Sequence, residues 1–188
     1  MKLLFKFNLV FLLVFALGLA ATGYVSWALL ERNAREEIAQ SARLLMDTAI
    51  ATRSYTNKQV GPLLETQMKY TFLPQSIAAY AAHEVFSDVR SKHTEYSYKE
   101  ATLNPTNPQH RAVDWEADVI SQFRNDKDRK ELVGERETPT GRSFYVARPF
   151  RITDPTCLRC HSTVEAAPKT MIDRYGTANG FGWLLNDV

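Results

Sequence analysis

The residues best placed to do chemistry are Cys157, Cys160 and His161, which form the motif Cys-x-x-Cys-His. Two thiols at this spacing can add across the two vinyl groups of one porphyrin, and the histidine that follows is then placed under the iron as an axial ligand. The chain has 2 cysteines, so none is left for a structural disulfide or a four-cysteine metal cluster. The motif therefore predicts one covalently attached haem c, with His161 as the proximal iron ligand.

Three other interpretations of the motif stay open. A redox-active dithiol normally lies where an apolar strand meets a helix N-terminus, whereas this motif follows a polar turn that contains Pro155. A zinc site needs a second pair of ligands at regular spacing, but His83, His93 and His110 stand alone in the sequence. A five-residue pattern also arises by chance. The motif favours haem c and leaves zinc, a dithiol and coincidence as alternatives.

The N-terminal segment gives an independent reason to favour haem c, which is attached outside the cytoplasmic membrane. Lys2 and Lys6 precede an uncharged run over residues 7–30, and Glu31 is the first charge after it. As a helix this run would reach about 36 Å, enough to cross a hydrocarbon core of about 30 Å. By the positive-inside rule the lysines place the N-terminus in the cytoplasm. We therefore expect a single-pass protein of the cytoplasmic (inner) membrane, with its domain in the periplasm or an equivalent outer compartment.

Whether the apolar segment is retained depends on its second half. Small residues over 18–22 would suit a signal peptidase. The apolar run nevertheless continues through Tyr24 and Trp27 to Leu30, which a soluble mature N-terminus would have to expose. Tyrosine and tryptophan also suit the membrane interface. We expect residues 1–30 to be an uncleaved transmembrane signal-anchor.

An outer-side helix is expected over residues 31–61. No glycine or proline occurs between Tyr24 and Val60, so the membrane helix can continue until Gly61 and Pro62 end it. Side chains spaced alternately four and three apart form a seam along this helix: Ile38, Ala42, Leu45, Ala49, Thr52 and Thr56. The seam could form a homodimer through the helix at 31–60. Packing within the protomer is favoured, because small and hydroxylic residues make a weak coiled coil.

Residues 62–188 are expected to form one domain of helices and short strands. Helical spacing predicts helices after Pro74 and over 113–123, and strands are predicted over 96–103 and 142–152. Helices followed by antiparallel strands indicate an α+β fold. The formal net charge is +2, and no basic stripe is interleaved with aromatic residues, so nucleic acid is not expected as a partner.

Long strings of this chain resemble a bacterial family of exported haem c domains. The strings are Arg53-Ser54-Tyr55-Thr56, Tyr98 to Pro108, Ala112 to Glu116, Gly141 to Ser143, Ile152 to Thr163 and Ala166 to Trp183. That family was long filed as a domain of unknown function and is described as a PAS-like periplasmic haem c sensor domain. The resemblance runs from about Glu31 to the end. It implies a PAS-like antiparallel sheet flanked by helices over 62–188, here preceded by a long N-terminal helix continuous with the membrane anchor. It also implies one haem c and, often, a histidine kinase or other output module.

The chain departs from this family in two ways. A relative of described structure uses a cysteine of an early helix as the distal iron ligand, whereas here both cysteines belong to the attachment motif. Chains of the family also commonly continue past the Gly-Phe-Gly-Trp region into another strand and a second membrane helix, whereas this one stops at Val188. We therefore expect the sequence to be a fragment, or its output to lie on a partner.

The distal iron ligand is open between several candidates. Met46 lies on a helical stripe with Ile50 and Arg53, and a thioether is a known partner for a haem with one histidine. A methionine on such a stripe is also often core filler, so an open or water-bound site competes with Met46. The weaker candidates are His83, His93, His110, Tyr55 and Met171. Three arginines near the motif could pair with haem propionates or face solvent: Arg142, Arg148 and Arg151.

Two classes of function fit these expectations. In the first, a mono-haem c domain senses redox state or a small gas, and the change at the iron shifts the helix that enters the membrane. In the second, the domain is a tethered electron-transfer cytochrome or the haem subunit of a membrane complex. The family resemblance favours the sensor, and the lack of an output module favours the carrier. No nucleophile–base pair or carboxylate couple stands out, so no enzymatic activity is expected.

Overall fold

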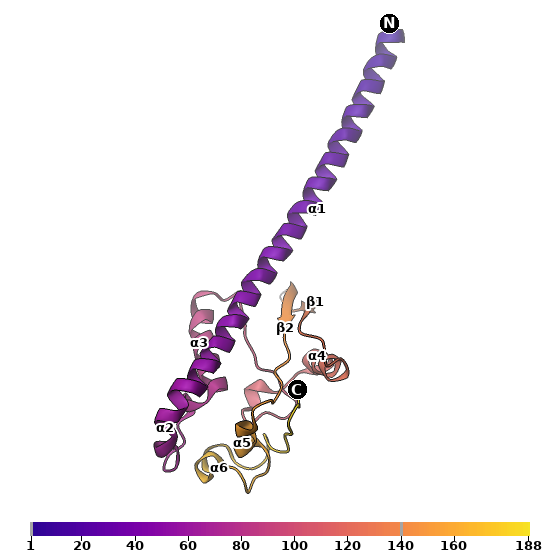
Figure 1. The fold of residues 1–188 in the computed structure, drawn as a ribbon. Coiled ribbons are helices and arrows are strands. Elements are labelled where there is room, and N and C mark those ends of the chain that lie inside the picture. The colour runs from indigo at the N-terminus through magenta and orange to yellow at the C-terminus, as the bar shows by residue number, and fades with distance from the viewer. Residues whose placement is uncertain (1, 140) are drawn as a thin grey trace. The chain divides into compact units, whose positions relative to one another are not determined.

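The computed structural model describes residues 2–139 and 141–188, and Figure 1 traces the order of the elements along the chain. The chain divides into two compact units, Met1–Leu44 and Leu45–Val188. The long helix α1 (Lys2–Tyr55) begins in the first unit and ends in the second. Every candidate site residue predicted above lies in the second unit.

The part of α1 in the first unit exposes its apolar side chains. Phe11 is 60% exposed and Leu17 is 70% exposed, although burying a side chain of this kind is worth about 1.5–3 kcal/mol in water. Such a surface suits lipid. Within the described residues one helix is long and apolar enough to cross a membrane, a property that a signal sequence near an N-terminus shares.

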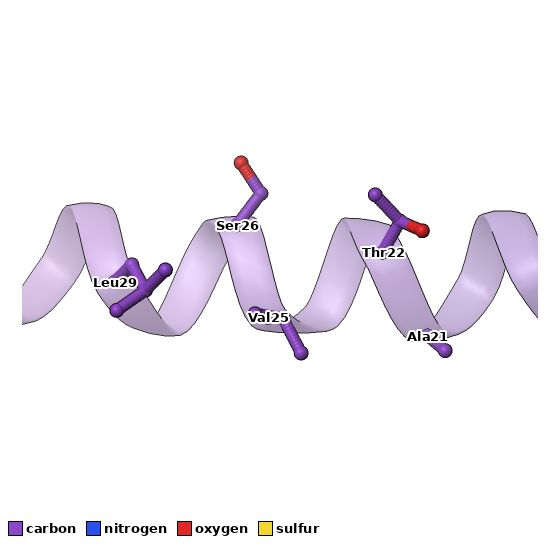
Figure 2. Close-up of a pocket in the computed structure, with 5 residues that line it drawn as sticks. All are labelled: Ala21, Thr22, Val25, Ser26 and Leu29. Carbon is purple, nitrogen blue, oxygen red and sulfur yellow. The ribbon is translucent and has the colours of Figure 1, made fainter.

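A shallow pocket lies on this part of α1, and Figure 2 shows the side chains that line it. The residues that line it are Ala21, Thr22, Val25, Ser26 and Leu29. The hydroxyl of Thr22 donates to the carbonyl of Gly18 one turn earlier, at 2.8 Å. The helix therefore satisfies this hydroxyl internally, as an apolar environment requires.

The helix does not end at Gly61 and Pro62, so that prediction is wrong. After α1 the chain makes a π-helical turn, Thr56–Val60, and continues as α2, Gly61–Met68. The N–H of Gly61 bonds to the carbonyl of Thr56, five residues earlier. This wider turn makes room for the ring of Pro62, which in a regular α-helix would clash with the carbonyl four residues before it.

Both helices predicted within residues 62–188 are confirmed. After a 3₁₀ turn at Pro74–Ser76 the helix α3 runs over Ala78–Lys92, and α4 runs over Asp114–Asn125. Their buried side chains are Ala78, Ala82 and Phe86 on α3 and Val119, Ile120 and Phe123 on α4. The remaining helical segments are Pro108–His110, Pro155–Cys157, α5 (Leu158–His161) and α6 (Lys169–Tyr175).

The sheet consists of two antiparallel strands, β1 (Leu132–Thr138) and β2 (Gly141–Ala147). Tyr145 lies opposite Gly134, where an added Cβ would stand 2.6 Å from the tyrosine hydroxyl, so a larger residue at 134 would require the Tyr145 ring to move. Trp115 of α4 packs on Tyr145 with ring centroids 5.2 Å apart. The start of α4 therefore contacts the hairpin, and the predicted α+β class, an antiparallel sheet flanked by helices, is confirmed.

The strand predicted over 96–103 does not form. The alternating pattern is present, because Tyr98 and Glu100 are half-buried whereas Ser97 and Lys99 are exposed. The buried side chains of this extended segment pair with helix residues instead of a neighbouring strand: Phe86 stacks on Tyr98 with centroids 4.5 Å apart. Its pairing with other backbone is one isolated bridge between Thr102 and Arg111. The strand predicted over 142–152 is confirmed only as far as Ala147.

Candidate functional site

The Cys-x-x-Cys-His motif occupies one compact helical turn. The carboxylate of Asp154 accepts a hydrogen bond from the backbone N–H of Thr156 at 2.9 Å and so begins the 3₁₀ turn that ends at Cys157. The helix α5 follows at once. Cys157 and Cys160 are three residues apart, which places both side chains on one face of the turn.

Both cysteines are free thiols and both are half-buried. Burial raises the pKa of the Cys157 thiol, the Asp154 carboxylate raises it further, and the charge of Arg53 opposes this. Burial also raises the pKa of the Cys160 thiol, against the charge of Arg159. A redox dithiol needs a lowered thiol pKa to form its nucleophilic thiolate. The structure therefore argues against the dithiol interpretation.

The zinc interpretation also finds no support. Structural zinc takes four ligands, most often Cys and His. Over residues 2–139 and 141–188, no three or more His, Cys, Asp or Glu side chains gather in a way that could hold a metal ion. The two thiols and His161 are therefore not part of a larger set of protein ligands in the described chain.

The ring of His161 is held in place by the C-terminal loop. Its Nδ1 lies 2.8 Å from the carbonyl oxygen of Gly180, and because a carbonyl can only accept, Nδ1 carries the proton and Nε2 keeps its lone pair. Trp183 stacks on the ring with centroids 4.1 Å apart and planes 13° from parallel. Burial lowers the pKa of His161, although the bond to Gly180 opposes this. The lowered pKa favours the neutral imidazole, which is the state that can ligate a metal.

Asn104 attaches this loop to the rest of the domain. Its side-chain N–H donates to the carbonyl of Phe181 at 3.0 Å, and its side-chain oxygen accepts from the N–H of Gly180 at 3.1 Å. Its backbone carbonyl accepts from the indole N–H of Trp183 at 3.3 Å. One asparagine therefore fixes both the peptide group that holds His161 and the ring that stacks on it.

Gly180 is required at its position for two reasons. Its φ is +88°, a conformation that residues with a side chain rarely adopt. A Cβ would also stand 2.1 Å from Oγ1 and 2.9 Å from Cα of Thr106. Two further backbone bonds join the loop to the motif: the N–H of Gly182 donates to Ser162 at 2.8 Å, and that of Trp183 donates to His161 at 3.1 Å.

The sequence predicted no role for Asn104, Gly180 or Trp183 in holding His161. The available signals were the two glycines around Phe181 and the asparagine before Pro105, both of which indicate turns. Neither signal indicates that the two turns meet. We call Asn104, Gly180 and Trp183 the His161 clamp.

Met46, the distal candidate, is half-buried on α1. It lies seven residues before Arg53, which puts the two side chains on the same face of the helix. Arg53 forms an ion pair with Glu100 and lies 4.3 Å from the ring centroid of Phe150. The charge of Arg53 also acts on the thiol of Cys157. This face of α1 is therefore near the motif, and the role of Met46 as an iron ligand stays a prediction.

The weaker distal candidates are scattered. His93 and Tyr55 are exposed, whereas Met171 is a core residue of α6 with 3% exposure. His83 and His110 are brought together, with ring centroids 5.2 Å apart.

The three arginines considered for propionates all have protein partners. Arg142 lies 3.5 Å from Glu135, and Arg148 lies 2.6 Å from Asp47 and 2.9 Å from Glu131. Arg151 donates to the carbonyl of Phe123 at 2.9 Å.

Comparison with known proteins gives one family and one structure. The model of the Tll0287-like family matches residues 31–188. The crystal structure of the cyanobacterial heme-protein Tll0287 matches with a TM-score of 0.58 and 16% sequence identity, over 81% of this chain and 89% of that one. At this identity the structural likeness shows the fold alone. No match was found among curated proteins.

We predict that Asn104→Ala loosens the His161 clamp. The change leaves the N–H of Gly180 and the carbonyl of Phe181 without their partner, which should lower the free energy of unfolding by about 2 kcal/mol. Asn107→Ala is the matched control, because Asn107 accepts one local bond from Gln109 at 3.1 Å and should cost about 1 kcal/mol or less. Chemical denaturation and hydrogen exchange at Gly180 measure both effects. Equal losses in the two variants would contradict the clamp.

Proposed function

This chain belongs to the Tll0287-like family, and from that membership we propose that it is a membrane-anchored domain carrying one haem c. Cys157 and Cys160 would hold the haem covalently, and His161 would be its proximal iron ligand. The observation that carries this proposal is the state of His161: Nδ1 is bonded to the Gly180 carbonyl at 2.8 Å, so Nε2 is the free nitrogen. Iron-ligating histidines usually have their second nitrogen fixed in this way.

Buried polar atoms near the motif also support a bound group. Within the described residues three such atoms have no hydrogen-bond partner: His83 Nδ1, Thr106 Oγ1 and His110 Nδ1. Buried polar atoms are nearly always partnered. Thr106 lies against Gly180, the residue that holds His161, and His110 lies four residues further along the same loop. Of these three atoms, Thr106 Oγ1 is therefore the one that lies beside the loop holding His161.

Different residues of the chain would attach the haem, ligate its iron and orient the ligating imidazole. When bound, haem c supplies a one-electron iron couple and an iron position at which a small gas can bind. The half-buried thiols of Cys157 and Cys160 attach it, and His161 ligates the iron through Nε2. Asn104, Gly180 and Trp183 orient the imidazole. Met46 is our distal candidate, because it shares a helix face with Arg53, which acts on Cys157.

The location follows from the N-terminal segment. We propose that residues 1–30 anchor the protein in the cytoplasmic membrane in a single pass, with the haem domain on the periplasmic or equivalent outer side. The apolar exposed surface of α1 supports the anchor, and Lys2 and Lys6 support the orientation. The proposed partners are the membrane, a histidine kinase or an electron-transfer complex, and a second copy through the helix at 31–60. We propose no enzymatic activity.

Of the two function classes we propose the sensor, with the tethered electron carrier as the alternative. The helix α1 is continuous over Lys2–Tyr55, and it includes both the membrane-crossing candidate and Met46. A change at the iron that moves Met46 would therefore act directly on the helix that reaches the membrane. A carrier would instead benefit from a site that changes little between oxidation states.

We predict covalent attachment of the haem. In a variant with Cys157→Ala and Cys160→Ala, acidic organic solvent should extract all of the haem, because no thioether bond holds it. The unaltered protein is the control and should keep its colour in the same solvent. Loss of colour from the unaltered protein, or zinc in place of haem, would contradict the assignment.

A second prediction concerns the anchor. Intact protein should stay in the membrane fraction through a high-salt wash, because the exposed apolar face of α1 binds lipid rather than a charged surface. N-terminal sequencing of that fraction should find Met1 or Lys2. A soluble form that begins near Ala21 would instead identify a cleaved signal peptide.

A third prediction separates sensor from carrier. Hydrogen exchange over residues 31–60 should differ between the oxidised, reduced and carbon monoxide-bound protein, because the iron state would change the packing around Met46. Met46→Leu should remove the difference, whereas Met171→Leu, a matched change in the buried core of α6, should keep it. Identical protection in all three states, with rapid reversible electron exchange with a membrane complex, would leave the carrier.

A further inference from the structure

The loop that holds His161 contains the dipeptide Asn179-Gly180, and Asn179 alone in this chain is an asparagine followed by glycine. The main-chain nitrogen that follows an asparagine can attack the side-chain amide and close a five-membered ring. Glycine permits this attack best, because it has no side chain to obstruct its own nitrogen. The sequence therefore places a chemically reactive dipeptide at the Gly180 carbonyl, which holds the ring of His161.

Arg111 contacts the group that would be attacked. Its guanidinium donates to Oδ1 of Asn179 at 2.8 Å. Because a guanidinium has donors only, the amide oxygen of Asn179 faces it. A cation bonded to this oxygen withdraws electrons from Cγ and stabilises the negative charge that develops on the oxygen when a nucleophile adds to Cγ. Arg111 therefore activates the amide of Asn179 toward attack.

Asn104 restrains the group that would attack. Its Oδ1 accepts from the main-chain N–H of Gly180 at 3.1 Å, and Gly180 is buried. The reaction needs this nitrogen to lose its proton and turn toward Cγ of Asn179, and the bond to Asn104 opposes both steps. Asn104 also donates to the carbonyl of Phe181 at 3.0 Å, which fixes the next peptide group. The fold thus activates the electrophile of the dipeptide and restrains its nucleophile.

We propose that Asn179 is a site of spontaneous deamidation, which Arg111 activates and Asn104 holds in check. When the loop opens, the nitrogen of Gly180 gives its proton to a base in solvent and forms a bond to Cγ of Asn179. The bond from Cγ to the amide nitrogen breaks, and that nitrogen takes up a proton and leaves as ammonia. Water then opens the ring at one of its two carbonyl carbons. One water molecule is consumed, one ammonia molecule is released, and nothing is oxidised or reduced.

The two products affect the His161 clamp differently. Aspartate at 179 leaves the main chain as it was and places a carboxylate beside Arg111, where an ion pair replaces the present hydrogen bond. Isoaspartate instead adds one methylene to the main chain just before Gly180. Gly180 has little room to shift, because a Cβ on it would stand 2.9 Å from Cα of Thr106. Isoaspartate therefore breaks the bonds of Gly180 to Asn104 and His161 and opens the clamp.

The test is to incubate the intact protein, folded in detergent, at mildly alkaline pH. Mass spectrometry of peptides follows the exchange of NH₂ for OH at position 179, and an isoaspartyl methyltransferase detects isoaspartate. Asn104→Ala should speed the reaction at least about fivefold, the factor that corresponds to one hydrogen bond on the N–H of Gly180. Val119→Ala is the matched control, because it removes part of a core side chain of α4 with 8% exposure and leaves the loop intact. It should leave the rate unchanged.

A second pair of variants tests the activating cation. Added to Asn104→Ala, Arg111→Gln should slow the deamidation by about tenfold, which is less than such a donor contributes in a buried active site, because Arg111 is exposed. Arg142→Gln is the control, since it removes the same charge from a side chain that is 67% exposed and pairs with Glu135. It should have no effect on the rate.

Hydrogen exchange on the reacted protein tests the effect on the clamp. The N–H groups of Gly182 and Trp183, which donate to Ser162 and His161, should exchange faster in the isoaspartate fraction than in the aspartate fraction. Equal exchange in the two fractions would overturn the opening of the clamp.

Three other results would overturn the deamidation site itself. They are equal rates in Asn104→Ala and Val119→Ala, equal effects of Arg111→Gln and Arg142→Gln, and a reaction of the unaltered protein that is as fast when folded as in denaturant. These measurements need no haem, so protein that lacks covalent haem would overturn the proposed function and leave this site unaffected.

Discussion

The hydrogen bond from Nδ1 of His161 to the carbonyl of Gly180 is the constraint on which the candidate site depends. It fixes the tautomer of the imidazole and therefore decides which nitrogen is free. The bond requires a glycine at φ +88° pressed against Thr106, and Asn104 holds that glycine in place. A turn, an asparagine and an aromatic ring thus fix the orientation of the His161 imidazole.

The positions of α3 and α4 could be predicted from the sequence because helical periodicity is local, and the motif is visible for the same reason, although its chemistry stays a prediction. Cys157, Cys160 and His161 are neighbours whose spacing is visible in the chain, and α3 and α4 follow from side chains repeated every three or four residues. Where local patterns allow two outcomes, the prediction was wrong. The alternation around Tyr98 is real, but the partner that buries its ring is Phe86 of a helix and not a strand.

The clamp could not be predicted, because its contacts are long-range. Asn104 meets Gly180, Phe181 and Trp183 across 76 to 79 positions of sequence. Each segment alone indicates only a turn. The same holds for His83 and His110, which the sequence presents as separate residues and the fold packs together. Sequence patterns predict helices and the motif here. The contacts of the His161 clamp depend instead on how the loop at Asn104 packs against the loop at 180–183.

The π-helical turn at Thr56–Val60 has a consequence for the helical phase of the chain. A π turn contains about one residue more than an α turn, and each residue of a helix advances the facing direction by about 100°. Side chains of α2 therefore face a direction that differs by roughly one residue step from the one an unbroken helix would give them. Loss of a single residue from this turn would change the direction that every side chain of α2 faces, and a regular α-helical turn in its place would bring the ring of Pro62 against the carbonyl four residues before it. The number of residues in the turn Thr56–Val60 thus determines which direction the side chains of α2 face.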